Sequence, residues 1–83
     1  MAPHDIWKAV RRRPFVPFRL TLTEGSTYDI KHPEFCIVTM TSVFIGLLPT
    51  DDPDPLPQRS VEVDVAHVVK VEPIQVPAKG KKP

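Results

Sequence analysis

Within its first twenty residues the chain changes from the hydrophobic spacing of a helix to that of a strand, and this change limits what it can fold into. From residue 18 onward apolar and polar side chains alternate on both sides of Gly25. The apolar positions of this stretch are Phe18, Leu20, Leu22, Tyr28 and Ile30. A period of two is typical of strands that bury one face. The pattern therefore predicts an antiparallel hairpin that turns around Gly25.

The register of this hairpin can be predicted, because directly opposed residues must lie on one face of the sheet. A two-residue loop would pair Leu20 with Asp29 and mix the two faces. A three-residue loop, residues 23–25, pairs Leu20 with Tyr28 and keeps apolar residues together. It also puts Gly25 at the position that needs a left-handed residue. We therefore predict the three-residue loop.

A short helix, about residues 5–12, is predicted before the hairpin. Asp5 is a suitable N-cap, and Pro14 ends the helix because proline disfavours a helical residue before it. The apolar residues of this helix are Ile6, Trp7 and Val10. A helix this short is unstable alone. We therefore expect it to dock these residues on the sheet, with Trp7 as the anchor.

Further strands are predicted in "FCIVTM" and "SVFIGLL", with a turn near Thr41-Ser42. Both carry apolar residues on both faces, which suits a strongly bent or closed sheet in which neither face is simply exposed. The last regular stretch, "SVEVDVAHVVKVEPI", is long for one strand, and a break near Ala66-His67 would leave "VVKVEP" as a separate strand. The valines that share one parity in this stretch are Val61, Val63, Val65, Val69 and Val71.

The sequence predicts one small domain, residues 1–76. It includes an acidic, proline-rich loop at 49–60 and is followed by a disordered basic tail at 77–83. The acidic residues of the loop are Asp51, Asp52 and Asp54. A chain of 83 residues buries a modest core, and oligomerisation is a common way to stabilise such a domain.

The predicted fold is mainly β: a short N-terminal α-helix followed by a four- or five-stranded antiparallel, strongly bent sheet or small barrel. This order of elements, with its strand-glycine-strand opening, resembles the SH3-like small barrels and, among them, the Sm-like fold. The ending "VAHVVKVEP" is similar to the last strand of bacterial Hfq-type Sm proteins, in which a Lys-His pair precedes an apolar strand. Here Val65-Ala66 stands in the place of that pair, and His67 follows one residue later. The resemblance implies RNA binding as one possible function.

The chain also resembles a group of short bacterial proteins that share the pattern "RPFxPFRLxLxxGxxYxIxHPEF". This resemblance covers most of residues 12–73. It implies a common fold and no particular activity.

Basic residues gather in two places although the net charge is only +1. The candidate contacts for nucleic acid or for a protein partner are Arg11, Arg12, Arg13, Arg19, Lys31, Lys79, Lys81 and Lys82. Guanidinium groups suit phosphate, and clustering raises the local potential. The alternative is that cations at the end of a helix complement its dipole while Arg19 faces solvent. The aromatic residues Trp7, Phe15, Phe18 and Tyr28 could stack bases, but the pattern favours the core for them.

Candidate metal and catalytic groups are few. The alternating residues His32, Glu34 and Cys36 could hold a metal ion, with His4 or His67 added from elsewhere. We favour a turn at Pro33 in which His32 makes a side-chain hydrogen bond and Cys36 is a small core residue. Ser42 or Cys36 could also act as a nucleophile with His67, but nothing in the sequence favours this. We therefore predict no catalytic residue, no metal and no cofactor, and a protein that is not an enzyme.

The single cysteine excludes an intramolecular disulfide, and a reducing, cytoplasmic setting is expected. We expect neither a signal peptide nor a membrane partner, since no apolar run has the required length. The sequence thus predicts a small β interaction or assembly module that self-associates or is a subunit of a larger complex. The alternative is an Sm-like RNA-binding protein that uses the arginine patch and the lysine tail.

Overall fold

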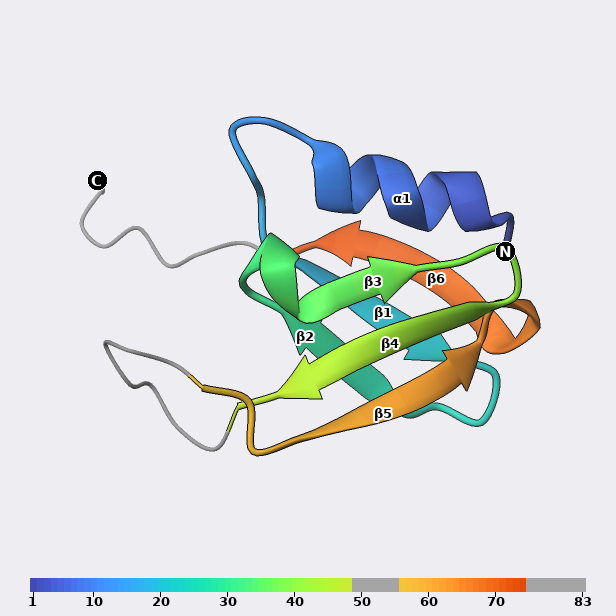
Figure 1. Ribbon diagram of the computed structural model, residues 1–83. Helices are drawn as coiled ribbons and strands as arrows, with labels where there is room; N and C mark the ends of the chain where they lie inside the picture. The colour runs from blue at the N-terminus through green and yellow to red at the C-terminus, as the bar shows by residue number, and fades with distance from the viewer. Residues whose placement is uncertain (49–55, 75–83) are drawn as a thin grey trace, which may run out of the picture.

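The computed structural model describes residues 1–48 and 56–74, and within them it contains one helix and six strands (Figure 1). The elements are α1 (Pro3–Arg11), β1 (Phe18–Leu22), β2 (Thr27–Ile30), β3 (Cys36–Val38), β4 (Ser42–Leu47), β5 (Arg59–Asp64) and β6 (Val68–Pro73). Two short 3₁₀ turns, Pro33–Phe35 and Val65–His67, complete the described chain. The prediction of a mainly β fold with a short N-terminal helix is confirmed.

The strands form two antiparallel sheets, β2-β1-β6 and β3-β4-β5. The prediction of four or five strands is wrong, and across residues 1–48 and 56–74 the two sheets do not close into a barrel. The reason is that each 3₁₀ turn interrupts hydrogen-bonded pairing and carries the chain from one sheet to the other. The first turn joins β2 to β3, and the second joins β5 to β6. The break predicted near Ala66-His67, with "VVKVEP" as a separate strand, is confirmed.

The register of the first hairpin is confirmed, with Leu20 opposite Tyr28. The amide of Leu22 donates to the carbonyl of Ser26 at 2.8 Å and thereby closes a three-residue loop. Gly25 has a φ of 100°, which is the left-handed conformation that favours glycine.

The helix begins earlier than predicted, at Pro3, and Ala2 is its N-cap. Proline suits the first turn of a helix because its φ is already fixed there and its missing N–H would have no partner. Asp5 therefore lies inside the first turn and does not cap the helix as predicted. The helix ends at Arg11, because Arg12 takes an extended conformation.

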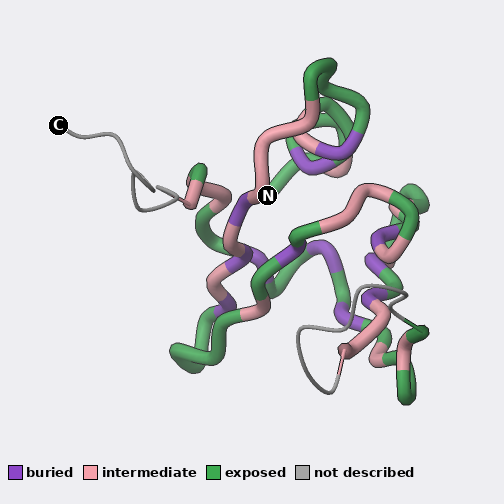
Figure 2. The backbone as a smooth tube through the Cα atoms, turned by 90° about the vertical axis from the view of Figure 1, so that its left-hand side faces the viewer, coloured by how far each residue is buried: buried purple, intermediate pink, exposed green. Residues whose placement is uncertain are grey.

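One hydrophobic core lies between the two sheets and under α1 (Figure 2). Its members are Ile6, Val10, Phe18, Leu20, Leu22, Ile30, Cys36, Val43, Ile45, Val63, Val65 and Val68. The prediction that Trp7 anchors the helix in this core is wrong, since its side chain is 45% exposed. Ile6 and Val10 are four residues apart and share the inner face of α1, while Trp7 is rotated away from it. Tyr28 and Phe15 pack against the core and are half-buried.

The prediction that alternate valines of the last stretch all face the same side of the sheet is wrong. The Val65–His67 turn shifts the alternation, so that Val68 is buried and Val69 is exposed. A β-bulge then separates Val68 from Lys70 in their pairing with β1, and Val71 again faces inward opposite Leu20.

The acidic loop is shorter than predicted, because Arg59 already pairs with Leu47 as the first residue of β5. Asp51, Asp52 and Asp54, and the whole tail at 77–83, lie outside the described residues. Among the described residues no helix has both the length and the apolar character that crossing a membrane requires.

The two isoleucines of the β3-β4-β5 sheet provide a matched test of this core. Ile45 is 1% exposed and Ile37 is 61% exposed. Ile45→Val should lower the free energy of unfolding by about 1 kcal/mol, because it leaves a cavity that the packed core cannot fill. Ile37→Val should change it by less than about 0.5 kcal/mol. Urea unfolding followed by far-UV circular dichroism measures both, and equal losses would contradict this assignment of the core.

Candidate interaction surface

The arginines at the end of α1 are held mainly by the helix itself. Arg13 Nη1 donates to the carbonyl oxygens of Val10, at 3.0 Å, and Arg12, at 2.7 Å. The guanidinium of Arg11 lies over the Trp7 ring, 5.3 Å from its centroid. Arg12 is exposed. These contacts agree with the interpretation of the cluster as cations at a helix C-terminus.

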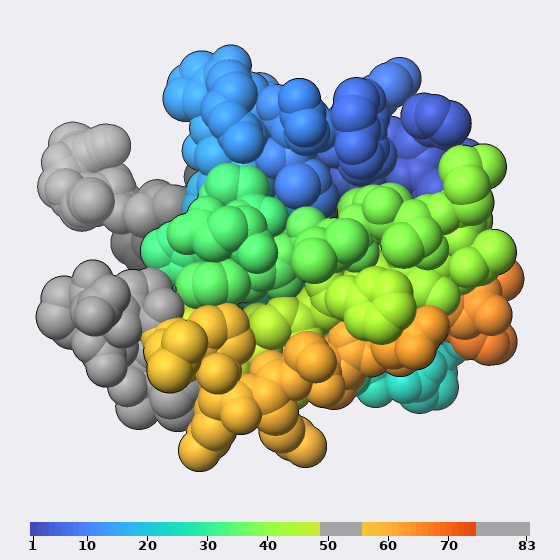
Figure 3. Space-filling view, in the orientation of Figure 1, coloured from blue at the N-terminus to red at the C-terminus, as the bar shows by residue number. Residues whose placement is uncertain are grey.

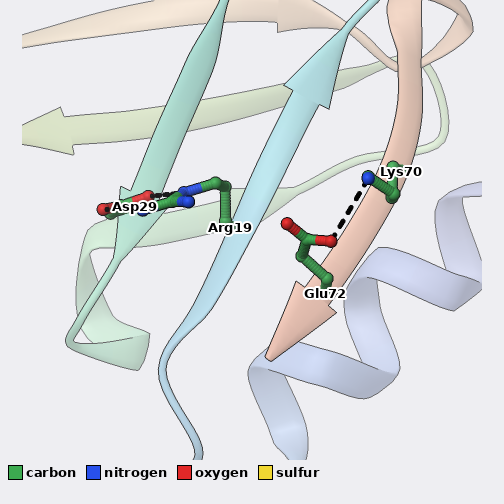
Figure 4. A network of polar contacts seen from close by, with 4 residues as sticks. All are labelled: Arg19, Asp29, Lys70 and Glu72. Atoms are coloured by element: carbon green, nitrogen blue, oxygen red, sulfur yellow. Dashed lines mark hydrogen bonds and ion pairs between the residues drawn. The ribbon is translucent and has the colours of Figure 1, made fainter. Parts of the chain in front are cut away.

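Arg19 lies apart from that cluster, on the outer face of the β2-β1-β6 sheet (Figure 4). Its guanidinium donates twice to Asp29 on the neighbouring strand, Nε to Oδ1 at 2.7 Å and Nη2 to Oδ2 at 3.1 Å. Glu72 is opposite Arg19 on the other side, and Lys70 Nζ lies 3.3 Å from Glu72 Oε1. Charges of alternating sign therefore cross this face, and we call these four residues the charge ladder.

The other predicted contacts do not join the arginines. Lys31 is exposed and follows the last residue of β2. Lys79, Lys81 and Lys82 lie outside the described residues. The structure therefore does not gather the predicted basic residues into one patch within the part of the chain that it describes.

The Arg19–Asp29 ion pair shifts the pKa of both groups. The hydrogen bond from Arg19 holds the pKa of the Asp29 carboxyl below its ordinary value, against the opposing effect of partial burial. The same bond raises the pKa of Arg19. Lys31 adds a smaller favourable charge at Asp29.

The His32, Glu34 and Cys36 stretch forms the expected turn, with Glu34 inside the Pro33–Phe35 3₁₀ turn. The ring of His32 packs edge-on against Phe35, with centroids 5.5 Å apart. Cys36 is a core residue, as predicted, and burial raises the pKa of its thiol to about 11. Within residues 1–48 and 56–74, no three His, Cys, Asp or Glu side chains are grouped so as to hold a metal ion.

The hydroxyl of Ser42 is also engaged, because it donates to Glu62 on β5 at 2.8 Å. His67 is exposed within the Val65–His67 turn. The structure thus gives Ser42 a carboxylate partner and places Cys36 in the core.

The feature that the sequence analysis missed is a hollow between α1 and the turn from β3 to β4. It has a volume of about 280 Å³ and is lined by Pro3, His4, Trp7, Val38, Thr39 and Met40. We call it the α1 groove. The indole of Trp7 meets the His4 ring edge-on, with centroids 6.4 Å apart.

A hydrogen-bonded turn fixes one wall of the α1 groove. The amide of Thr39 donates to the carbonyl of Ser42 at 2.8 Å. Thr39 Oγ1 accepts from the amides of Thr41, at 3.2 Å, and Ser42, at 2.9 Å. This turn holds Met40 outward, and its side chain is 71% exposed. These hydrogen bonds therefore fix the backbone of this wall, although the apolar side chain of Met40 is exposed.

Figure 3 shows the helix α1 above strands β3, β4 and β5 on one side of the molecule, and exposed apolar residues also lie on the outer face of these strands. Ile37 and Phe44 are directly opposed on β3 and β4, and both are exposed. A hollow of about 480 Å³ lies beside them, toward Pro57. Gly46 permits this arrangement, because a Cβ at that position would lie 3.0 Å from Pro57 Cγ.

The prediction that neither face of these strands is exposed is therefore wrong. The apolar residues on the second face of β3 and β4 are not covered by further chain among the described residues. Two signals in the sequence could have indicated this surface: Trp7 lies off the Ile6–Val10 face of the helix, and Met40 lies in a polar turn.

Comparison with known proteins found no matching family model, no matching curated protein and no matching solved structure. The function is therefore argued from the geometry of this surface.

The Asp29 carboxyl should titrate below 3.8, the ordinary value for aspartate, when its chemical shift is followed by NMR. A lowered pKa in the folded state means that the pair stabilises the fold above the unfolded-state pKa and that this contribution is lost as the pH falls through the folded-state pKa. Arg19→Gln should return the Asp29 midpoint toward 3.8, while Lys70→Gln should leave it unchanged. An unchanged midpoint in Arg19→Gln would show that the ion pair is not formed in solution.

Cys36 should react slowly with iodoacetamide in the folded protein at pH 8. With a pKa of about 11, only about one thiol in a thousand is ionised at that pH, and the core also blocks access. In 6 M guanidinium the same thiol should react at the rate of a free cysteine. Mass spectrometry of timed samples measures both rates, and fast labelling of the folded chain would contradict the burial of Cys36.

Proposed function

We propose that this chain is a non-enzymatic interaction or assembly module, which self-associates or serves as a subunit of a larger complex in the cytoplasm. One observation carries the proposal: large apolar side chains on three adjacent elements are exposed together. They are Trp7 on α1, Ile37 on β3, Met40 in the following turn and Phe44 on β4. Exposed apolar residues are common singly, but a cluster on one side of a small domain is typical of an interaction surface.

The size of this surface sets the expected affinity. Fully covering a fully exposed apolar side chain contributes about 1.5–3 kcal/mol. The four side chains are only 37–71% exposed, so together they contribute less than four times that amount. Association itself costs about 4–15 kcal/mol, and we therefore expect a weak, concentration-dependent association.

The proposal that the fold is of the SH3-like or Sm-like type rests on the order of elements, a helix followed by short antiparallel strands. It also rests on the similarity of "VAHVVKVEP" to the last strand of the Hfq-type proteins. Domains of the SH3-like and Sm-like type are frequently used as binding modules, which agrees with the proposed role.

RNA binding is the second candidate, and one contact favours it. The guanidinium of Arg11 and the ring of Trp7 lie together on the exposed side of α1, and this combination of a cation and an aromatic face can stack a base. The Arg19–Asp29 pair counts against it, because Arg19 already has a carboxylate partner.

Light scattering across a range of protein concentrations, with absorbance at 260 and 280 nm recorded on the same peak, tests the two candidates together. An assembly module should show a mass that rises above the 9.4 kDa of one chain, with the absorbance ratio of protein alone. Met40→Glu should reduce this mass, because a charge cannot be buried in the contact without a partner.

Val69→Glu is the matched control, since Val69 is also an exposed apolar residue but belongs to the other sheet. It should leave the mass unchanged. A mass of 9.4 kDa at every concentration would contradict self-association. A high absorbance at 260 nm that is lost at high salt would favour RNA binding instead.

A further inference from the structure

The α1 groove has a largely apolar lining, and one cation lies beside it, since the Arg11 guanidinium is 5.3 Å from the centroid of the Trp7 ring. Trp7, Val38 and Met40 provide the apolar lining. Lys8 is a further exposed cation of α1, and Asp5 is its one exposed carboxylate. Arg12 lines a separate hollow with Val16 and Pro73. The groove therefore suits a peptide that combines one bulky apolar side chain with acidic neighbours.

The chain itself carries a segment of this chemistry. Leu56 is 79% exposed and is flanked in the sequence by prolines and by three aspartates, in "DDPDPLP". Proline lowers the conformational entropy that such a segment loses on binding, and proline-rich peptides dock in grooves lined by aromatic residues. Trp7 provides the aromatic wall.

Leu56 cannot enter the groove of its own molecule. The amide of Gln58, two residues away, donates to the carbonyl of Leu47 at the end of β4, at 2.8 Å. The groove is lined by Thr39 and Met40, which belong to the turn that precedes Ser42 at the other end of β4. Figure 1 shows the two ends of this strand on opposite sides of the molecule. The six residues of β4 span roughly 20 Å at about 3.4 Å per residue. A two-residue tether reaches only about 7 Å.

We infer that the α1 groove of one molecule binds the acidic, proline-rich segment of a second copy, with Leu56 as the anchoring side chain. This inference rests on the proposed self-association and names its contact. Groove and ligand are different parts of the chain, so the contact is head-to-tail, and each pair of molecules keeps one free groove and one free Leu56. Such contacts continue into chains or close into rings.

A complementation experiment tests the head-to-tail contact. Met40→Glu damages the groove, Leu56→Glu damages the ligand, and both side chains are exposed, so neither change removes a core contact. Each variant alone should be monomeric at a concentration at which the wild type associates. An equimolar mixture should form a dimer of about twice 9.4 kDa and nothing larger, because one intact groove and one intact Leu56 remain. Light scattering measures the masses, and circular dichroism verifies that each variant is folded.

The outcomes separate this inference from the proposed function. If the wild type associates and Leu56→Glu associates equally, the inference fails and self-association stands. If the mixture of the two variants stays monomeric, the head-to-tail geometry is wrong. If the wild type is monomeric throughout, self-association and its inferred contact both fail.

A peptide titration tests the chemistry of the groove directly. The probe is a synthetic peptide with the sequence of residues 49–58, PTDDPDPLPQ, added to the Leu56→Glu variant, whose groove is intact. Trp7 is the only tryptophan, so its fluorescence reports binding. Arg11→Glu should weaken binding by about fivefold, and Lys31→Glu, a charge reversal of the same size outside the groove, should not. No change of Trp7 fluorescence with the peptide, or equal binding of a peptide with alanine in place of the leucine, would overturn the inference.

Discussion

Each of the two sheets turns one apolar face toward the other, and the burial of these inner faces against one another is the interaction on which the structure depends. A sheet of three short strands by itself would leave its inner face exposed to water. Leu20 from one sheet and Ile45 from the other belong to the same core, and α1 covers it with Ile6 and Val10. The two 3₁₀ turns serve this arrangement, since they let one continuous chain supply strands to both layers.

This constraint also explains the exposed surface. The described residues form two sheets and one helix, and all of these contribute to the single core. Among the described residues, no further element covers the outer side of β3 and β4. Ile37 and Phe44 are therefore exposed. A partner that binds this side would cover it in the way that a third layer of helices or strands covers a sheet in a larger domain.

The features predicted correctly from the sequence are those that depend on local rules. The hairpin register follows from the alternation around Gly25, and the break near Ala66-His67 follows from the length of the stretch. The features predicted wrongly depend on distant contacts. Val68 instead of Val69 faces inward because β6 pairs with β1 through Val68 after the Val65–His67 turn. The exposure of Trp7 is set by which side of α1 meets the core. The apolar surface was missed for the same reason. The chain has more apolar residues than its core can bury, and the sequence pattern does not indicate which of them stay exposed.

The charge ladder gives the molecule a second side of opposite character. Asp29, Arg19 and Glu72 lie side by side on three strands, and Lys70 follows along β6 (Figure 4). On the other side of the molecule, Ile37 and Phe44 are exposed, and Phe44 lies opposite Glu62, which accepts a hydrogen bond from Ser42. The two outer faces therefore differ in how a partner would meet them: one already satisfies its charges by pairing them within the sheet, and the other leaves apolar side chains without a contact.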